Sequence, residues 1–211
     1  IANGSQIVLA KASLSVQADG NLTVGSALGV SGNSTVQLHA DQENNGSGTL
    51  SLSGNLDVGS GTLSLQSAGN LAFGSNTLTS SHTGTAITLL SRSGVVTSNA
   101  NASGEVLAAS GHVVITASSG IDLDLQAASV EATNSSNAID LSDVDSLLIK
   151  TVSNSGGGNI HIHTANGSLT DDSDAAVDIT TTGTLTLDAT TGIDLDTQVG
   201  TLDVDNSASG N

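Results

Sequence analysis

A long internal repeat, with a period of about 72 residues, constrains the fold of this chain more than any other feature of its sequence. The sixteen residues Gly111–Gln126 return as Gly183–Gln198, with eight identical positions and the same apolar or polar character at most of the others. With one residue inserted, the match extends back to pair Ala86–Leu89 with Asn159–Ile162. Repeated supersecondary units stack on their neighbours and share one continuous core. We therefore expect an extended array rather than a globule with a single centre.

The repeat also predicts how the chain is organised. We expect one continuous segment over residues 1–211, with degenerate repeats in 1–85, one copy of the long repeat in 86–158 and an incomplete copy in 159–211. The chain begins without Met, shows no signal peptide and stops within the second copy. We therefore expect it to be a segment of a longer protein. No apolar run approaches the roughly 18 residues of a membrane span.

Short stretches of alternating apolar and polar residues fill the spaces between turn signals. Examples are Leu50-Ser51-Leu52, Leu63-Ser64-Leu65 and Ile160-His161-Ile162. Alternation with period two places successive side chains on opposite faces of a strand. Turn signals such as Gly54-Asn55 separate strands of three to five residues, and no stretch has the apolar periodicity of a helix.

Two all-β architectures fit short strands, a sandwich or barrel and a parallel β-helix. The chain has no Pro, Trp or Tyr and one Phe, Phe73, whereas sandwich cores commonly contain aromatic residues. In a stacked helix most backbone N–H groups bond to the next coil, and Pro would interrupt that ladder. We therefore predict a right-handed parallel β-helix of about nine to eleven coils of roughly 18–24 residues, about 45–50 Å long. We expect essentially no α-helix.

The charge is strongly acidic and unevenly placed. The formal net charge is −17, with only Lys11, Arg92 and Lys150 as bases, and residues 106–211 hold fifteen of the twenty acids. Nucleic-acid binding needs clustered Lys and Arg to neutralise phosphates, so it is excluded as an expected function. Attraction to an anionic membrane surface is excluded for the same reason.

Several motifs resemble filamentous-haemagglutinin-like repeats. They have the form Gly-Asn-Leu-x-Val or Gly-x-Leu-x-Leu and occur at Gly20–Val24, Gly54–Val58, Gly48–Leu52 and Gly61–Leu65. The later segments, such as Gly183–Val204, are similar to the long repeats of giant bacterial surface proteins related to that group. The resemblance implies a β-helical shaft exported to the bacterial surface, with a role in adhesion, biofilm formation or cell–cell contact.

Two acidic strands are the first candidates for a metal site. In Ile121-Asp122-Leu123-Asp124 and in Ile193-Asp194-Leu195-Asp196, the apolar residues should face inward and both carboxylates outward. If the coils align, Asp188, Asp203 and Asp205 extend this acidic surface. Ca²⁺ takes six to eight oxygen ligands, so Asp122, Asp124, Asp194 and Asp196 are candidate Ca²⁺ ligands. The alternative is a solvated acidic surface that keeps the protein soluble.

Two further groups of residues resemble metal ligands. Asp171-Asp172-Ser173-Asp174 lies in an expected loop and is a second candidate for Ca²⁺. His161 and His163 flank Ile162, so both imidazoles should leave the same face of a strand. Such a pair can bind a transition metal such as Zn²⁺ when a third ligand lies nearby, and otherwise the two rings only stack on the surface.

An enzyme is not expected. Polysaccharide lyases and pectinases also use β-helices, but their sites need grouped carboxylates with Lys or Arg, and sugar grooves usually present aromatic residues. We therefore expect no catalytic residues and no cofactor apart from Ca²⁺. The expected function is a structural shaft or filament segment of a secreted or surface-attached bacterial protein. Its expected partners are neighbouring coils, identical segments end to end, and a host or neighbouring-cell surface.

A binding module is the second expectation. In that case the acidic polar face engages a glycan or a partner protein, with Ca²⁺ as a bound ion. A melting temperature that rises with millimolar Ca²⁺ distinguishes this module from an inert spacer.

Overall fold

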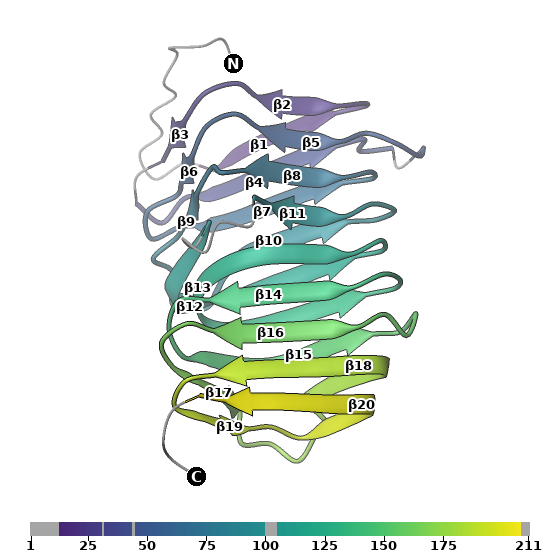
Figure 1. The fold of residues 1–211 in the computed structure, drawn as a ribbon. Helices are drawn as coiled ribbons and strands as arrows, with labels where there is room; N and C mark the ends of the chain where they lie inside the picture. Colours follow the sequence, from purple (N-terminus) through teal and green to yellow (C-terminus); the bar gives the residue numbers. More distant parts are fainter. Residues whose placement is uncertain (1–12, 31, 44, 100–104, 208–211) are drawn as a thin grey trace.

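The computed structural model describes residues 13–30, 32–43, 45–99 and 105–207, and these residues form an all-β structure. Twenty strands follow one another along the chain, and no helix occurs in the described ranges. No helix that could cross a membrane is therefore found in them. Every pairing between the described strands is parallel. Figure 1 shows the strands stacked from the N-terminal to the C-terminal end.

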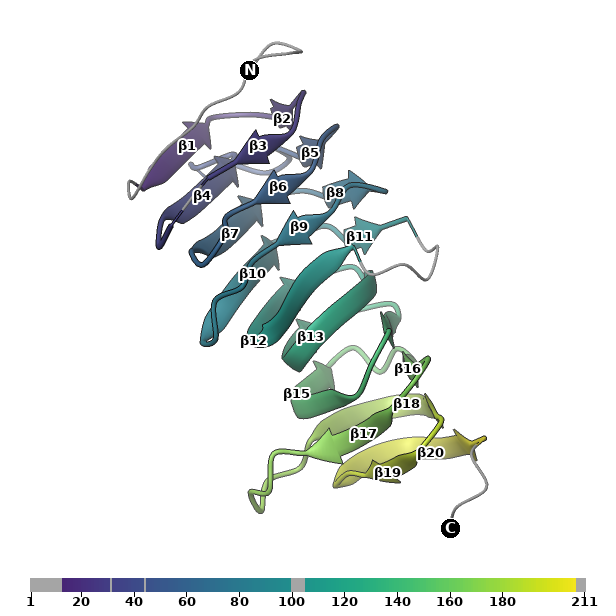
Figure 2. The same ribbon diagram turned by 90° about the vertical axis from the view of Figure 1, so that its left-hand side faces the viewer.

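The strands form three rows, and the chain visits the rows in the same order each time (Figures 1 and 2). We call one passage through the three rows a coil. The first row contains β1 (Leu14–Ala18), β4 (Thr35–Ala40), β7 (Thr62–Ser67) and β10 (Thr85–Ser91), then parts of β12 (Val106–Ala117), β13 (Ile121–Asn134), β15 (Leu147–Asn154), β18 (Ile179–Ala189) and β20 (Thr197–Asn206).

The other two rows use shorter strands and the remaining parts of the long ones. The second row contains β2 (Leu22–Val24), β5 (Leu50–Leu52), β8 (Leu71–Gly74), β11 (Val96–Ser98), β14 (Ile139–Asp143), β16 (Ile160–Thr164) and parts of β13, β18 and β20. The third row contains β3 (Leu28–Gly29), β6 (Leu56–Asp57), β9 (Leu78–Thr79), β17 (Ser168–Asp171), β19 (Gly192–Asp194) and parts of β12, β13 and β15.

Aliphatic residues pair in register through all the coils of the second row. The column contains Leu22, Leu50, Leu71, Val96, Ile121, Ile139, Ile160, Leu185 and Leu202. The stretch of chain between neighbours in this column is longest from Leu22 to Leu50 and shortest from Leu185 to Leu202. The coils therefore vary more in length than the sequence pattern predicts, because the corners absorb the difference.

Four strands are much longer than the three to five residues expected. β12 has 12 residues, β13 has 14, β18 has 11 and β20 has 10. Each of them passes from one row to the next, and irregular register marks the bend in β12 and in β18. The alternation in the sequence shows which residues face inward, but it does not show whether a strand ends at a corner or continues around it.

The core is a column of small aliphatic side chains with one aromatic ring. The inward residues of the alternating stretches are buried as expected, including Leu123, Ile160, Leu187 and Phe73. Leu195 is only partly buried and packs against the edge of this core. Leu202 and Val204 keep the register of Leu185 and Leu187 but are 51% and 48% exposed, because no described strand covers β20 on its outer side.

The Gly-Asn-aliphatic motifs have a specific structural role at the corners. In four of them the Asn carboxamide oxygen accepts a backbone N–H from the next coil: Asn21 from Thr49 at 2.9 Å, Asn55 from Thr77 at 3.0 Å, Asn70 from Val95 at 3.2 Å and Asn159 from Thr184 at 3.0 Å. The Asn side chains therefore continue the ladder of backbone hydrogen bonds at positions where the chain turns.

The two copies of the long repeat do not lie one above the other. Ile87 of the first copy is in the first row, whereas its equivalent, Ile160, is in the second row. The same displacement takes Val113 of the first row to Leu185 of the second, and Ile121 of the second row to Ile193 of the third. Equivalent segments are thus three coils and one row apart.

The glycine of the Gly-Asn-Leu motif gives a direct test of coil packing. A Cβ atom at Gly54 would overlap the backbone of Ser26 and Ala27 in the preceding coil, whereas a Cβ at Gly20 meets no described atom within 4 Å. We expect Gly54→Ala to lower the free energy of unfolding by about 1–3 kcal/mol, the usual effect of overpacking, and Gly20→Ala to leave it nearly unchanged. Chemical denaturation of both variants measures this, and equal effects would contradict the stacked arrangement.

The Asn ladder gives a second prediction. Asn55→Ala removes the acceptor of the Thr77 N–H, and we expect the free energy of unfolding to fall by about 0.5–1.5 kcal/mol. Gln42→Ala, at an exposed turn position, is the matched control and should change stability by much less. A loss no larger in Asn55→Ala than in Gln42→Ala would show that the corner bond does not stabilise the fold.

Candidate functional site

The four candidate Ca²⁺ ligands on the acidic strands do not form one group. Asp122 lies in β13 and pairs with Thr97 and Asp140 in the second row, whereas Asp194 lies in β19 and pairs with Thr170 in the third. The one-row displacement between the two repeat copies is the reason, because it places equivalent strands on different sides of the stack.

Asp124 is not on the solvent-exposed surface where the alternation placed it. Asp124 is only 5% exposed and lies beside Glu105, which is 2% exposed. Burial, and then the neighbouring carboxyl of Asp124, raise the pKa of Glu105 above its usual range. The register pairs Asp124 with Ser142, so Asp124 keeps the outward position that the alternation predicts but is buried there, whereas Asp122 is outward and exposed.

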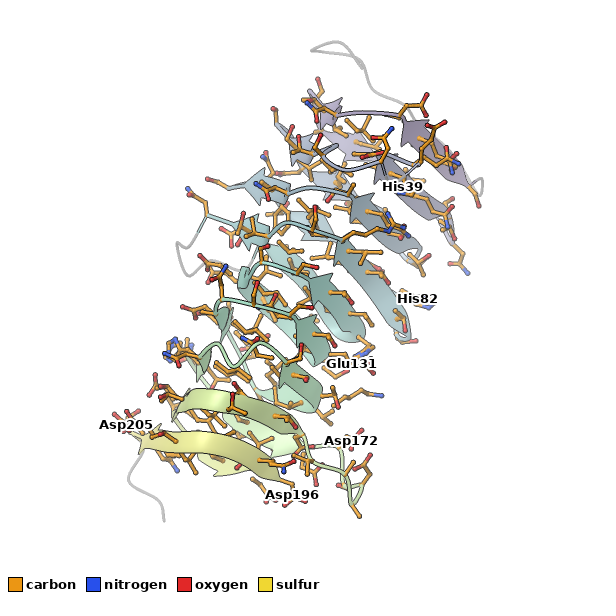
Figure 3. All side chains as sticks on the ribbon, turned by 90° about the vertical axis from the view of Figure 1, so that its right-hand side faces the viewer. His39, His82, Glu131, Asp172, Asp196 and Asp205 are labelled. Carbon is orange, nitrogen blue, oxygen red and sulfur yellow. The ribbon has the colours of Figure 1, made fainter. Side chains whose placement is uncertain are left out.

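A different set of acids gathers on the outward side of the second row. Two adjacent columns run along the stack there: Asp122, Asp140, His161, Thr186 and Asp203 in one, and Ser142, His163, Asp188 and Asp205 in the next. We call these nine residues the acidic face, and Asp205 is labelled on it in Figure 3. Asp188, Asp203 and Asp205 join Asp122 here as the sequence predicted for aligned coils.

Asp140 is a member of the acidic face that sequence reasoning missed. It sits in Ile139-Asp140-Leu141, the same apolar-acid-apolar pattern as Ile121-Asp122-Leu123, and the two acids pair directly. Burial, followed by the charges of Asp140 and Asp124, raises the pKa of Asp122. The pattern was present in the sequence, but this stretch has no counterpart within the aligned repeat segments that drew attention to Asp122.

His161 stands between two carboxylates of this face. Its Nδ1 lies 3.1 Å from an oxygen of Asp140, and its Nε2 lies 2.8 Å from an oxygen of Asp188. Burial opposes protonation of the ring, but the hydrogen bond and charge of Asp188, together with those of Asp140, outweigh it and raise the pKa of His161. The imidazolium therefore bridges one acid in the preceding coil and one in the following coil.

This bridge changes the interpretation of the His161–His163 pair. The two rings do leave the same face, since His161 pairs with Asp140 and His163 with Ser142. Both ring nitrogens of His161 face carboxylates at hydrogen-bond distance, so a metal ion would have to break an ion pair to bind there. The geometry favours a proton-dependent link between coils over a Zn²⁺ site.

A small cavity of about 50 Å³ opens beside the acidic face. It is lined by Asp124, Leu125, Ser142, Asp143, Val144, His163 and Ala165. Asp143 is 2% exposed, and its carboxylate accepts the backbone N–H groups of Ala127 at 3.0 Å and Asp145 at 2.8 Å. Burial raises the pKa of Asp143 to about 6. The side chain therefore substitutes for a backbone acceptor where the third row is interrupted, and its role is structural.

The described basic side chains lie away from the acidic face. Arg92 contacts the His39 ring at 3.0 Å and Gln66 at 3.4 Å, on outward positions of the first row. Lys150 lies in β15 and lines a shallow depression with His112 and Ser129. The acidic face thus offers carboxylates, imidazoles and the hydroxyl groups of Ser142 and Thr186, a set suited to binding cations or polar groups.

Asp41 is another acid that the sequence did not single out. Its carboxylate accepts backbone N–H groups from Asn45 at 3.1 Å, Gly46 at 3.0 Å and Ser47 at 3.1 Å, and its own φ is 54°. Burial works against ionisation, but these bonds and a further one from Gly48 hold the pKa of Asp41 below its usual value. Asp41 therefore closes the long corner before β5 and carries no separate chemistry.

The second Ca²⁺ candidate does come together in space. Oxygen atoms of Asp171, Asp172 and Asp174 all lie within 4.8 Å of one another, in the loop between β17 and β18. Asp171 and Asp172 are half-buried and Asp174 is exposed. This cluster lies apart from the acidic face, as the separation of Asp172 and Asp205 in Figure 3 shows.

The His161 bridge predicts a specific pH dependence of stability. A histidine whose pKa is raised on folding contributes stability that is fully present below its unfolded pKa of 6.5 and is lost as the pH rises through its folded pKa. We expect the melting temperature to fall between pH 6 and pH 8, and His161→Gln to make this part of the profile flatter. His82→Gln, in the turn between β9 and β10, is the control, and His82 is labelled in Figure 3. Identical slopes in the parent and His161→Gln would contradict the bridge.

The roles given to these residues rest on distances, burial and charge within this chain. No protein-family model, curated protein or solved structure matches it.

Proposed function

We propose that the chain is a right-handed parallel β-helix and serves as a shaft segment of a large secreted or surface-attached bacterial protein. The observation that carries the proposal is the in-register column from Leu22 to Leu202, in which every coil adds one aliphatic residue and one parallel strand pairing. Connections between parallel strands of one sheet are right-handed in nearly all proteins, which supports the handedness.

Mechanical strength follows from this arrangement. Backbone hydrogen bonds between coils run along the stack, as in Leu22 N–H to Thr49 O at 2.9 Å and Leu50 N–H to Asn70 O at 3.0 Å. Burial of a Leu-class side chain contributes roughly 1.5–3 kcal/mol, and each coil adds several such residues to one continuous core. A stack of this kind resists bending and local opening, which suits a spacer in adhesion, cell–cell contact or an extracellular matrix.

The uncovered side of β20 supports assembly by further stacking. Leu202 and Val204 are half exposed and continue the columns of Leu185 and Leu187. A strand edge with free backbone groups and aligned aliphatic residues favours pairing with another strand of the same kind. We propose that a further coil of identical design is the occupant of this surface, since it would continue the interface between β18 and β20.

The acidic face favours a second function, a binding module. Asp122, Asp140, Asp188, Asp203 and Asp205 gather on one side of the second row. An exposed surface of this kind is suited to a glycan or a basic partner protein, with Ca²⁺ as a bridging ion. Glycan binding that depends on Ca²⁺ and is lost in Asp188→Asn with Asp205→Asn would favour this function over the shaft.

Electron microscopy and small-angle scattering test the shaft. At about 4.8 Å per coil, one chain should appear as a rod of about 40 Å in the stacked part, and end-to-end contact should give rods that are multiples of this length. Leu202→Lys with Val204→Lys should leave single rods, because charges on a strand edge oppose pairing. Asp203→Ala with Asp205→Ala changes the net charge by the same amount and should still assemble. Compact particles, or equal effects of the two double variants, would contradict the proposal.

A further inference from the structure

Four acids, Asp171, Asp172, Asp174 and Asp178, lie at the end of β17 and in the loop that leads to β18. This loop leaves the third row after Asp171, turns at Ser173, whose φ is 67°, and enters the first row at Ile179. Figure 3 shows Asp172 on this loop, which projects from the stack near its C-terminal end. Oxygens of Asp171, Asp172 and Asp174 lie within 4.8 Å of one another, a separation that one metal ion can span.

A fourth carboxylate, Asp178, supplies an independent sign that a ligand belongs here. Asp178 is 1% exposed, and its Oδ2 accepts the backbone N–H of Asp196 at 2.7 Å. Oδ1 is also buried but has no hydrogen-bond partner, and the same is true of one oxygen each in Asp171 and Asp172. A buried carboxylate oxygen with no donor is unfavourable by about 1–3 kcal/mol, more when the group is charged.

The Asp178 carboxyl lies against that of Asp171, the first residue of the cluster. Burial is the main cause that raises the pKa of Asp178, and the carboxyl of Asp171 raises it further through its charge and through a hydrogen bond that exists only when one of the two acids is protonated. None of the ion pairs in the described part of the chain involves these four acids. The arrangement therefore brings together negative charge and unpaired oxygens with no cation of the protein's own.

We propose that Asp171, Asp172, Asp174 and Asp178 form a Ca²⁺ site. Ca²⁺ accepts six to eight oxygens at 2.3–2.6 Å in flexible geometry, so four carboxylates with water and loop carbonyls suffice, whereas Mg²⁺ demands a near-ideal octahedron. The Asp174 carboxylate is already oriented by the N–H of Ala176 at 2.6 Å. The inference does not depend on the shaft function, because it rests on this loop alone.

The bound ion would join three successive parts of the chain. Asp171 ends β17, Asp178 precedes β18, and the bond from Asp178 to the Asp196 N–H reaches the chain just before β20. Ca²⁺ at the loop would thus hold the last coils together, and ion removal should loosen this end of the stack before the rest.

Calorimetric titration of the whole chain with CaCl₂ is the test. We expect one saturable site with a dissociation constant on the order of 10⁻⁴–10⁻³ M, the range of extracellular Ca²⁺ modules. Asp178→Asn and Asp174→Asn should each weaken binding at least about tenfold, while Glu43→Gln, which removes an equal charge from an exposed turn outside both acidic groups, should leave the affinity within about twofold. Far-UV circular dichroism checks that each variant is folded, and Asp174→Asn, at an exposed position, keeps the test valid if Asp178→Asn unfolds.

A second readout counts the protein ligands directly. The chain has no Trp or Tyr to sensitise a lanthanide, so Eu³⁺ must be excited directly, and its lifetimes in H₂O and D₂O report the number of bound waters. We expect Eu³⁺ to lose several waters in the parent chain and fewer in Asp174→Asn. No saturable Ca²⁺ binding at millimolar concentration, or equal weakening by Glu43→Gln, would overturn the site.

Discussion

The pairing of every coil with the next through backbone hydrogen bonds is the constraint on which the rest of this structure depends. Parallel pairing in register places each residue next to a residue whose side chain points to the same side of the sheet. An inward Leu therefore meets another inward aliphatic residue in the next coil. The column from Leu22 to Leu202 shows how consistently the sequence meets this condition. Where the chain turns and the backbone cannot pair, Asn21, Asn55, Asn70 and Asn159 supply the acceptor instead.

Stacking identical residues on one another is unfavourable when their side chains carry charges of the same sign. Asp122 lies directly beside Asp140, and Asp188 beside Asp205, at the short spacing of adjacent strands. His161 relieves part of this repulsion because it bridges Asp140 and Asp188 from the coil between them. Burial is the main cause that raises the pKa of Asp122 and of Asp143, whereas for His161 the carboxyls of Asp188 and Asp140 outweigh burial and raise the pKa, so the stability of the fold depends on pH through its surface as well as its interior.

Period-two alternation was enough to predict strands, inward residues and the absence of helix in the described ranges, because it depends only on local geometry. It predicted Leu123, Ile160, Leu187 and Leu195 as core residues; the first three are buried, and Leu195 is partly buried at the edge of the core. Period-two alternation failed to predict burial at residues whose surroundings depend on the corners between rows. Asp124 is buried although its neighbours alternate correctly. Asp178 is also buried, but it lies at the end of a loop, where no alternation marks it. Corner lengths set which coils and rows meet, and nothing local in the sequence fixes them.

The displacement of the long repeat by one row has a consequence for the outer surface. Residues Ile121–Asp124 and Ile193–Asp196 are identical in sequence, yet they lie on different sides of the molecule. A side chain that the two copies share is therefore presented on two different sides of this chain, and the repeat does not build one continuous surface along it.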